Sequence, residues 1–513
     1  MGKLLLLFWL LSVEPFEIEE EITNTPEFLE RIRRLEENPI NINNARKDEL
    51  LLVPYLDSYL VDRIIKYREK HPFLKKEELL LIEGITPYLF DRIKKFFVVE
   101  DKKQKRHKDS EFLLRFERKI SSPQSKVYNK VILPYKGIFL NALFEKDWKE
   151  EKPSKYYAFS IYIPEKLIIG NYDLDLGMGI IMGKPDFFYR GGSIPGEKGF
   201  SPHLSTYKEN YLRGITCEWK NLIFFSSYNK IETLGKEKLL GLSYKTSTIR
   251  VTGSFSEAEK NGKNILTSFY MVKDLGGNIF RLELGTGGGD FPKLKKNLSY
   301  SMGIDNGRGL KAIYVNIKDS LPTIRNSPFQ KDKEVFYLSY TRNISPIFSI
   351  GLFSEFSRNI SNFEPFNKIG EIHLSFTPIK NLTLENRIKA KIGQKNYRLD
   401  AIYKINEINL KTRFEALNGK EGSGFLTYLI LRHSKNFIFE GGLILYEIAN
   451  WESRIYEYEN DLPGKFTIKQ LYGSGKRLYF LLGEKLLPFK IHLKWGIDFK
   501  EEISHELGIA FLI

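Results

Sequence analysis

The residues with the clearest chemical potential form a short segment, Gly84-Ile85-Thr86-Pro87. A glycine that allows a positive φ, followed by a hydroxyl that can cap a helix starting at proline, is typical of a tight hairpin between helices. Such a hairpin aims backbone N–H groups at an anion bound at the N-terminus of the second helix. Gly84, Ile85 and Thr86 are therefore candidates for phosphate contacts.

Basic residues lie on both sides of this hairpin. Lys75 and Lys76 form an adjacent pair just before it, and a basic run without apolar residues follows at 102–108. The cations of that run are Lys102, Lys103, Lys105, Arg106 and Lys108. We add both groups to the candidate DNA-phosphate contacts, because lysine and arginine neutralise phosphate backbones. Residues 24–100, however, hold 14 Lys/Arg and 14 Asp/Glu, whereas DNA-binding modules usually carry a basic footprint.

Residues that could perform catalysis or bind metal do not group in the sequence. Cys217 is the single cysteine, which excludes a disulfide framework and a cysteine-cluster metal site. The seven histidines are scattered, and His203 lies near Ser205 without a neighbouring acid to orient it. We therefore expect no enzyme activity, no cofactor and no metal.

The elements that must position the candidate residues fall into four stretches. Residues 1–13, with Lys3 before an eight-residue apolar run, have the pattern of a secretory signal peptide; the alternative is an N-terminal helix packed on a core. Residues 24–100 have helical periodicity, and residues 101–110 have the composition of a basic linker. From residue 111 to residue 513 the apolar period changes from 3.6 to 2.

The helical stretch contains a repeat with two hairpins. Its segments are Asn41-Ile42-Asn43-Asn44-Ala45, Val53-Pro54-Tyr55-Leu56-Asp57 and Ile82-Glu83-Gly84-Ile85-Thr86. Over residues 39–99 this pattern resembles the paired helix-hairpin-helix domain of the competence DNA-receptor family, and the resemblance implies DNA contact through the hairpins. Tyr55 and Asp57 replace both glycines of the first hairpin, and Asp57 places a carboxylate where a phosphate would sit.

The remainder of the chain has the alternation of a membrane barrel. Segments 382–392, 397–404 and 408–416 each alternate an apolar face with a charged one, over lengths near the ~9–11 residues that a tilted strand needs to cross a bilayer. About two dozen such segments occur. A soluble sandwich or propeller is the alternative. We predict separate α and β domains: a small all-α paired helix-hairpin-helix domain followed by a large antiparallel transmembrane β-barrel.

The charged faces of these three strands predict the lining of a pore. A lysine or arginine that faces lipid at the midplane costs ~2–4 kcal/mol, so we expect these cations to face inward. The candidates are Arg387, Lys389, Lys391, Arg398, Lys404, Lys411 and Arg413. Because residues 101–513 carry a net charge of +19, the sequence predicts a pore that prefers anions.

Two further segments favour an envelope protein. Glu506, Gly508, Phe511 and Ile513 have a spacing that resembles the C-terminal assembly signal of Gram-negative outer-membrane barrels, which implies outer-membrane lipid and the barrel assembly machinery as partners. Segments 169–180 and 209–215 resemble those of Gram-negative envelope proteins that fuse a helix-hairpin-helix pair to a barrel. Between them, residues 183–208 fold into or over the pore or form an external loop. In the first case Lys184, Arg190, Lys198 and Lys208 would line the pore.

Two functions are compatible with these features, and an outer-membrane enzyme such as a lipase or protease is a third hypothesis, from another class. In the first, an outer-membrane barrel with a periplasmic helix-hairpin-helix module binds DNA or passes it across the envelope. In the second, a transport or structural barrel carries a module that docks a periplasmic protein or plugs the pore. Binding to DNA that weakens steeply with salt would favour the first, and docking that is insensitive to salt the second.

Overall fold

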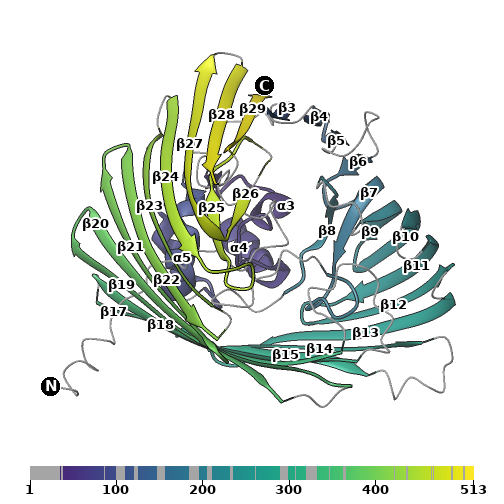
Figure 1. Ribbon diagram of the computed structural model, residues 1–513. Coiled ribbons are helices and arrows are strands. Elements are labelled where there is room, and N and C mark those ends of the chain that lie inside the picture. Colours follow the sequence, from purple (N-terminus) through teal and green to yellow (C-terminus); the bar gives the residue numbers. More distant parts are fainter. Residues whose placement is uncertain are drawn as a thin grey trace.

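The structure is a computed structural model, in which a small helical module lies within a ring of strands (Figure 1). The structure describes residues 35, 39–85, 87–99, 110–120, 125–146, 156–183, 196–204, 211–231, 235–259, 262–288, 298–306, 308–318, 332–345, 347–361, 365–420, 422–434, 437–463, 465, 467–486, 489–500 and 503–512. The predicted signal peptide and most of the linker lie outside these residues.

The helical module is built from short helices closed by a two-stranded parallel sheet. Its elements are β1 (Ile40–Asn41), α3 (Lys47–Leu50), α4 (Ser58–Lys70), the 3₁₀ helix η2 (Lys76–Leu81), α5 (Pro87–Ile93), the 3₁₀ helix η3 (Lys94–Phe96) and β2 (Phe97–Val98). β1 pairs with β2, so the two ends of the module meet. This agrees with the predicted helical domain.

The longest of the described helices, α4, begins and ends where its sequence predicts. The Asp57 side chain accepts a hydrogen bond from the backbone N–H of Leu60 at 3.0 Å, which caps the helix N-terminus. Arg68 and Lys70 lie in the last turn, where positive charge complements the helix dipole. Leu60, Val61 and Ile64 form its buried face. The first hairpin of the module therefore leads directly into a well-capped helix.

All other described strands but two form one closed antiparallel barrel. In chain order its strands are β3 (Glu111–Lys119), β4 (Ser125–Tyr135), β5 (Ile138–Lys146), β6 (Tyr156–Ile163), β7 (Leu167–Asp175), β8 (Gly199–Pro202), β9 (Leu212–Trp219), β10 (Leu222–Ile231), β11 (Gly235–Lys245), β12 (Ile249–Ala258), β13 (Gly262–Asp274), β14 (Ile279–Gly288), β15 (Ser299–Asp305), β16 (Leu310–Ile317), β17 (Lys333–Ser345), β18 (Phe348–Asn359), β19 (Asn367–Ile379), β20 (Leu382–Lys391), β21 (Gln394–Ile405), β22 (Ile408–Gly419), β23 (Gly422–Ser434), β24 (Phe437–Ile448), β27 (Gly473–Leu486), β28 (Phe489–Phe499) and β29 (Ile503–Leu512). β7 pairs directly with β9, and the short β8 pairs with β7 alone among the described strands, so the ring has 24 strand positions.

The two ends of the barrel differ in the connections they carry. At one end, which we call the short-turn end, strands are joined by two to four residues, as at 136–137 and 406–407. At the other, the long-loop end, the connections reach the lengths of 176–211 and 449–472. The barrel closes by pairing of β29 with β3.

The side chains of the wall alternate between an apolar outer face and a polar inner face. In β21, Leu399 is 46% exposed and its neighbour Arg398 is 4% exposed. The predicted strands 382–392, 397–404 and 408–416 correspond to β20, β21 and β22, which confirms their alternation. Among the described helices, none is long and apolar enough to cross a membrane.

The connection 449–472 forms a hairpin that is separate from the wall. Its strands are β25 (Ile455–Glu459) and β26 (Thr467–Leu471), which pair only with each other among the described strands. Ile448 at the end of β24 is paired directly with Gly473 at the start of β27, so the hairpin leaves the wall and returns at neighbouring positions. Its side chains bind inward-facing residues of β22, β27 and β28, as described below. We call residues 449–472 the lumen hairpin.

Candidate functional site

The helical module packs on the inner wall of the barrel. Its buried residues Leu60, Ile85 and Ile93 belong to the same hydrophobic cluster as Phe139 and Ile279 of the wall. On β6, the phenol of Tyr162 donates a hydrogen bond to the Asp48 carboxylate of the module at 3.1 Å. Tyr162 is the second-last residue of β6, so this contact lies at the short-turn end. The module is therefore docked at the short-turn end.

The first hairpin is fixed to the wall by a buried ion pair. Asp57 Oδ2 lies 2.6 Å from Arg281 Nη2 of β14, and the two side chains are 7% and 5% exposed. The Nε of the same guanidinium also donates to this oxygen, at 3.2 Å. The carboxylate that the sequence placed at the phosphate position thus has a cation from the barrel as its partner.

A segment of the long connection 176–211 covers the same hairpin. The carbonyl oxygen of Glu197 accepts a hydrogen bond from the backbone N–H of Ser58 at 2.9 Å. The Glu197 carboxylate binds Arg250 and Lys245 of the wall, each at 2.5 Å. Burial alone would raise the pKa of Glu197, but these two cations hold it below its usual value. Residues 196–204 therefore join the module to the wall, while 184–195 and 205–208 lie outside the described residues.

The second hairpin also faces the wall. Gly84 has a φ of +92°, and a Cβ there would lie 3.2 Å from the Cδ1 of Ile279. The N–H of Ile85 donates to Ile82 within the hairpin, at 3.0 Å. Arg63 donates to the carbonyl oxygen of Glu83 at 2.9 Å, which binds α4 to this hairpin. Both candidate phosphate-binding turns of the module are thus turned toward the barrel, and Thr86 lies outside the described residues.

The candidate cations of the module lie elsewhere. Lys75 is exposed, and the Lys76 ammonium group donates to the carbonyl oxygen of Lys94 at 3.3 Å. Lys102, Lys103, Lys105, Arg106 and Lys108 lie outside the described residues. The structure therefore does not bring Lys75 or Lys76 together with Asp57 at the interface.

A glycine-rich turn lies deeper in the lumen. The N–H groups of Met178 and Ile180 donate to the Glu283 carboxylate, at 2.6 Å and 3.1 Å. Gly177 has a φ of +76°, and a Cβ there would lie 2.9 Å from the carboxyl carbon of Glu283. This close approach explains the glycine at position 177. Glu283 lies two residues after Arg281 in β14, so the module and the glycine-rich turn bind the same strand.

The predicted pore-lining cations are found on the inner face or at its rim. Arg387, Arg398 and Arg413 are buried, and the latter two bind Glu415 and Asp400 of neighbouring strands at 2.9 Å and 2.6 Å. The remaining candidates are Lys389, which binds Glu371 at 3.2 Å, Lys411, which lies over the Tyr428 ring, and the exposed Lys391 and Lys404. The acidic partners of these cations lie on neighbouring strands. The net positive charge of the lining is therefore smaller than a count of the cations on a single strand suggests.

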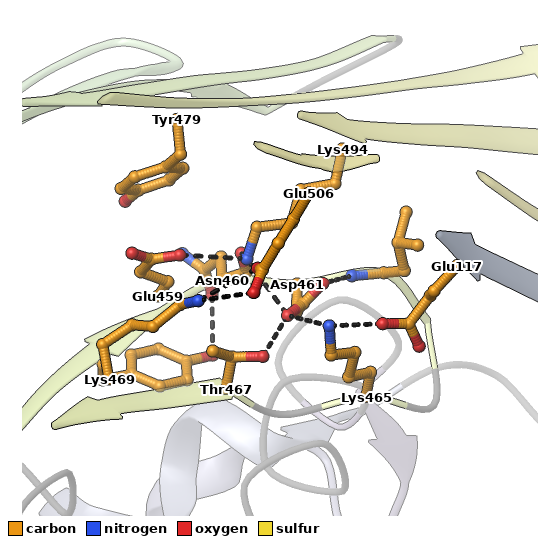
Figure 2. A network of polar contacts seen from close by, with 12 residues as sticks. Glu117, Glu459, Asn460, Asp461, Lys465, Thr467, Lys469, Tyr479, Lys494 and Glu506 are labelled. Carbon is orange, nitrogen blue, oxygen red and sulfur yellow. Dashed lines mark hydrogen bonds and ion pairs between the residues drawn. The ribbon is translucent and has the colours of Figure 1, made fainter. Parts of the chain in front are cut away.

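The lumen hairpin is held by a network of ion pairs, which Figure 2 shows from close by. Lys465 lies 2.6 Å from Glu117 of β3 and 3.2 Å from Asp461. Lys494 of β28 lies 3.1 Å from Asp461 and 3.3 Å from Glu459. Arg413 and Arg477 of the wall add contacts to Glu457 and Glu459. The hairpin is therefore bound to the wall on both sides of the β29–β3 closure.

The carboxylates of this network are kept ionised. Burial alone would raise the pKa of Glu459, but Lys494 and Arg477 lower it to about 2. Asp461 follows the same pattern: burial opposes its charge, while Lys465 and Lys494 hold its pKa well below the usual range. Each carboxylate is paired, as buried charges require.

The structure also corrects the interpretation of His203. No acid adjoins it in sequence, but Asp173 Oδ1 lies 2.8 Å from His203 Nδ1 because β7 and β8 run side by side. Ser205 lies outside the described residues. A period-2 pattern in 171–175 was the only sequence signal for this pairing. Among the described residues, no three or more His, Cys, Asp or Glu side chains are arranged to hold a metal ion.

Comparison with known proteins matches the module to a family model and aligns the chain with three solved structures. Residues 36–98 match the family model described as the helix-hairpin-helix motif. The P pilus usher (PapC) translocation pore aligns with a TM-score of 0.41 and 8% identity, covering 79% of this chain and 98% of that one. Two mutants of the Rh. blastica porin align with TM-scores of 0.28 and 0.27 at 10% identity, covering 52% and 56% of this chain and 92% and 100% of theirs. No curated protein matches the sequence.

Proposed function

We propose that this chain is an outer-membrane channel whose lumen is closed by its own helix-hairpin-helix module, acting as a plug at the short-turn end. The observation that carries the proposal is the buried ion pair between Asp57 and Arg281. A hairpin that served DNA in the resting state would leave its phosphate-binding turn open to solvent. Here that turn is occupied by the wall and by Glu197.

The outer surface and the turns support this proposed location. A closed barrel satisfies all its backbone groups, and its apolar outer face suits lipid. In outer-membrane barrels the short turns are periplasmic and the longer loops extracellular. A module docked at the short-turn end would therefore close the pore from the periplasm.

Conductance in planar bilayers tests the plug. We expect the full-length protein to conduct poorly and a variant that lacks residues 24–109 to show larger current steps, because the module lies within the ring and contacts the wall at Tyr162 and Arg281. Mobility in SDS gels before and after boiling verifies that both barrels are folded. Equal conductance of the two folded proteins would exclude a plug at this end.

A function with DNA is a second proposal. It is supported by the helix-hairpin-helix match over residues 36–98 and by the five cations of the 102–108 run. Because both hairpins face the wall, this function requires the module to undock before its turns can meet a phosphate. A gel shift with the full-length protein, with and without Arg281→Ala, tests it: undocking should strengthen binding.

A further inference from the structure

The barrel wall is interrupted between β6 and β9. β6 pairs with β7 only over the four positions from Ser160↔Gly170 to Ile163↔Leu167, so residues 156–159 have no partner in β7. On its other edge, β7 pairs with β9 up to Tyr172, and the short β8 pairs with β7 from Tyr172 to Asp175. In the half nearer the long-loop end, β6 therefore has no backbone ladder to β7, although β7 stays paired with β9 as far as Leu212.

The interruption arises because β7 turns into the lumen. Gly170 has a φ of +115°, and a Cβ there would collide with the carbonyl oxygen of Phe159. All four residues from Asn171 to Leu174 are buried, whereas a wall strand buries alternate residues. Both faces of this half-strand are thus covered by protein.

Side chains replace the missing backbone ladder. The N–H of Phe159 donates to the Asn171 side-chain oxygen at 3.3 Å, and Arg213 Nη2 donates to the carbonyl oxygen of Tyr157 at 3.3 Å. The Arg213 guanidinium also lies over the Tyr157 ring, 5.1 Å from its centroid. Tyr157 is 53% exposed, so this bridge lies at the outer surface. We call the gap bridged by these residues the seam.

Polar groups lead from the seam into the lumen. Arg213 Nη2 donates to the Tyr211 hydroxyl at 3.4 Å, and the Tyr211 ring lies 5.0 Å from the His203 ring. The backbone N–H of His203 donates to the carbonyl oxygen of Asn171 at 3.1 Å, so these two residues are neighbours across β7 and β8. His203 Nε2 and Asn171 Nδ2 are buried and have no hydrogen-bond partner among the described residues.

We propose that the seam binds an anionic amphiphile of the surrounding leaflet, with a phosphate headgroup that carries hydroxyls. Arg213 and the Asn171 amide donate to phosphate oxygens, in the charge-assisted geometry that arginine favours. His203 Nδ1 is engaged by Asp173, which leaves Nε2 to accept from a headgroup hydroxyl. The acyl chains lie along the exposed apolar side chains of Phe159, Ile169 and Ile215.

The position of Arg213 favours a membrane amphiphile over a dissolved anion. Arg213 occupies the second residue of β9, close to the long-loop end, and it reaches the outward ring of Tyr157. Arginine and tyrosine are stable at the depth of the headgroups, whereas arginine at the midplane is costly. A dissolved anion would instead be met by the cations inside the lumen.

Native mass spectrometry of the purified full-length protein in detergent tests this inference. We expect one dioleoylphosphatidylglycerol to be retained at a concentration where dioleoylphosphatidylcholine is not. Arg213→Ala should weaken retention about tenfold or more, since a charged donor is removed, and Arg213→Lys should restore most of it. Arg118→Ala is the matched control, because Arg118 is exposed near the same end of β3 and is paired on both sides.

Three outcomes would overturn the proposal. They are equal retention of the two phospholipids, equal retention by the wild type and Arg213→Ala, and an equal loss in Arg118→Ala. An arm with oleate distinguishes the headgroup: oleate retained as tightly as phosphatidylglycerol would refute the assignment of a phosphate. Boiling-dependent gel mobility shows that each variant is folded. The outcome does not depend on whether the module plugs the channel.

Discussion

Asp57 Oδ2 and Arg281 Nη2 lie 2.6 Å apart although 224 positions separate the two residues in the chain. The other oxygen of the same carboxylate caps α4 through the N–H of Leu60. One side chain therefore starts the longest helix of the module and also binds that module to the barrel. Loss of its partner should loosen docking while the helix cap remains.

Removal of the guanidinium should weaken docking strongly. We expect Arg281→Ala to destabilise the docked state by about 3–5 kcal/mol, because the Asp57 carboxylate would be left buried without a counter-ion. Limited proteolysis of the folded barrel should then cut the module faster. Lys238→Ala is the control: its pair with Glu257 spans 4.0 Å between exposed side chains, and such pairs contribute ~0–1 kcal/mol. Equal protection of the module in both variants would contradict the prediction.

Acid should weaken the attachment of the lumen hairpin to the barrel wall. The pKa of Glu459 is depressed to about 2 in the folded protein from an ordinary value near 4.5, so its contribution is complete above pH 4.5. That contribution, at most about 3 kcal/mol, should be lost as the pH falls from 4.5 to about 2. The thermal midpoint of the wild type, followed by scanning fluorimetry, should drop through this window.

Two variants separate Glu459 from the other carboxylates. Glu459→Gln should have a lower thermal midpoint than the wild type at neutral pH. Its midpoint should also fall less steeply between pH 4.5 and about 2. Glu259→Gln should behave as the wild type, since the Glu259 side chain is exposed and lies 3.9 Å from Lys236. A Glu459→Gln profile parallel to that of the wild type would show that this carboxylate is not coupled to stability.

Removal of the lumen hairpin should reveal the charge of the pore. Ile448 and Gly473 are paired directly, so a tight turn can replace residues 449–472. Arg413 would lose Glu457 and Arg477 would lose Glu459, which leaves the inner wall more positive. We expect this variant to prefer anions when reversal potentials are measured in a salt gradient. Lys389→Glu with Lys391→Glu should reduce the preference, and cation selectivity would refute the proposed lining.

Binding to DNA by the full-length protein should be weak and should depend on the 102–108 run. Replacement of its five cations by glutamine should abolish a gel shift, and removal of any one cation that binds a phosphate should reduce the salt slope by about one unit. The control carries glutamine at Lys236, Lys238 and Lys263, whose side chains are exposed at the long-loop end. Binding that survives in the first variant and fails in the control would place the DNA-binding surface elsewhere.

The sequence alone was sufficient to predict those elements whose residue pattern is local. β20, β21 and β22 follow the alternation of 382–392, 397–404 and 408–416, because each strand has an exposed apolar face on one side and polar partners on the other. The lumen hairpin has the same period of two in Ile455–Glu459, so alternation alone cannot separate it from the wall. Its place depends on ion pairs with Arg413 and Arg477, which only the folded ring brings near.

The first hairpin shows how a local prediction and a distant contact combine. Tyr55 stands where the hairpin pattern has a glycine, yet its φ of +70° keeps the left-handed backbone that the turn requires. That conformation costs an L-residue ~1–2 kcal/mol, and the contact of the Arg92 guanidinium with the Tyr55 ring, at 4.9 Å, offsets part of it. The partner of Asp57 could not be foreseen, because nothing in the sequence relates it to Arg281.

Closure of the ring between β29 and β3 constrains the order of assembly. The module precedes β3 in the chain, and its anchor Arg281 lies in β14, about halfway around the sheet. A growing sheet can therefore bind the module long before its last strand is made, whereas a finished ring would have to admit it whole. The module should thus act as a template around which the half-built sheet curves. In a protein that lacks the module, the barrel should close later, and more pairing registers should be open to its strands.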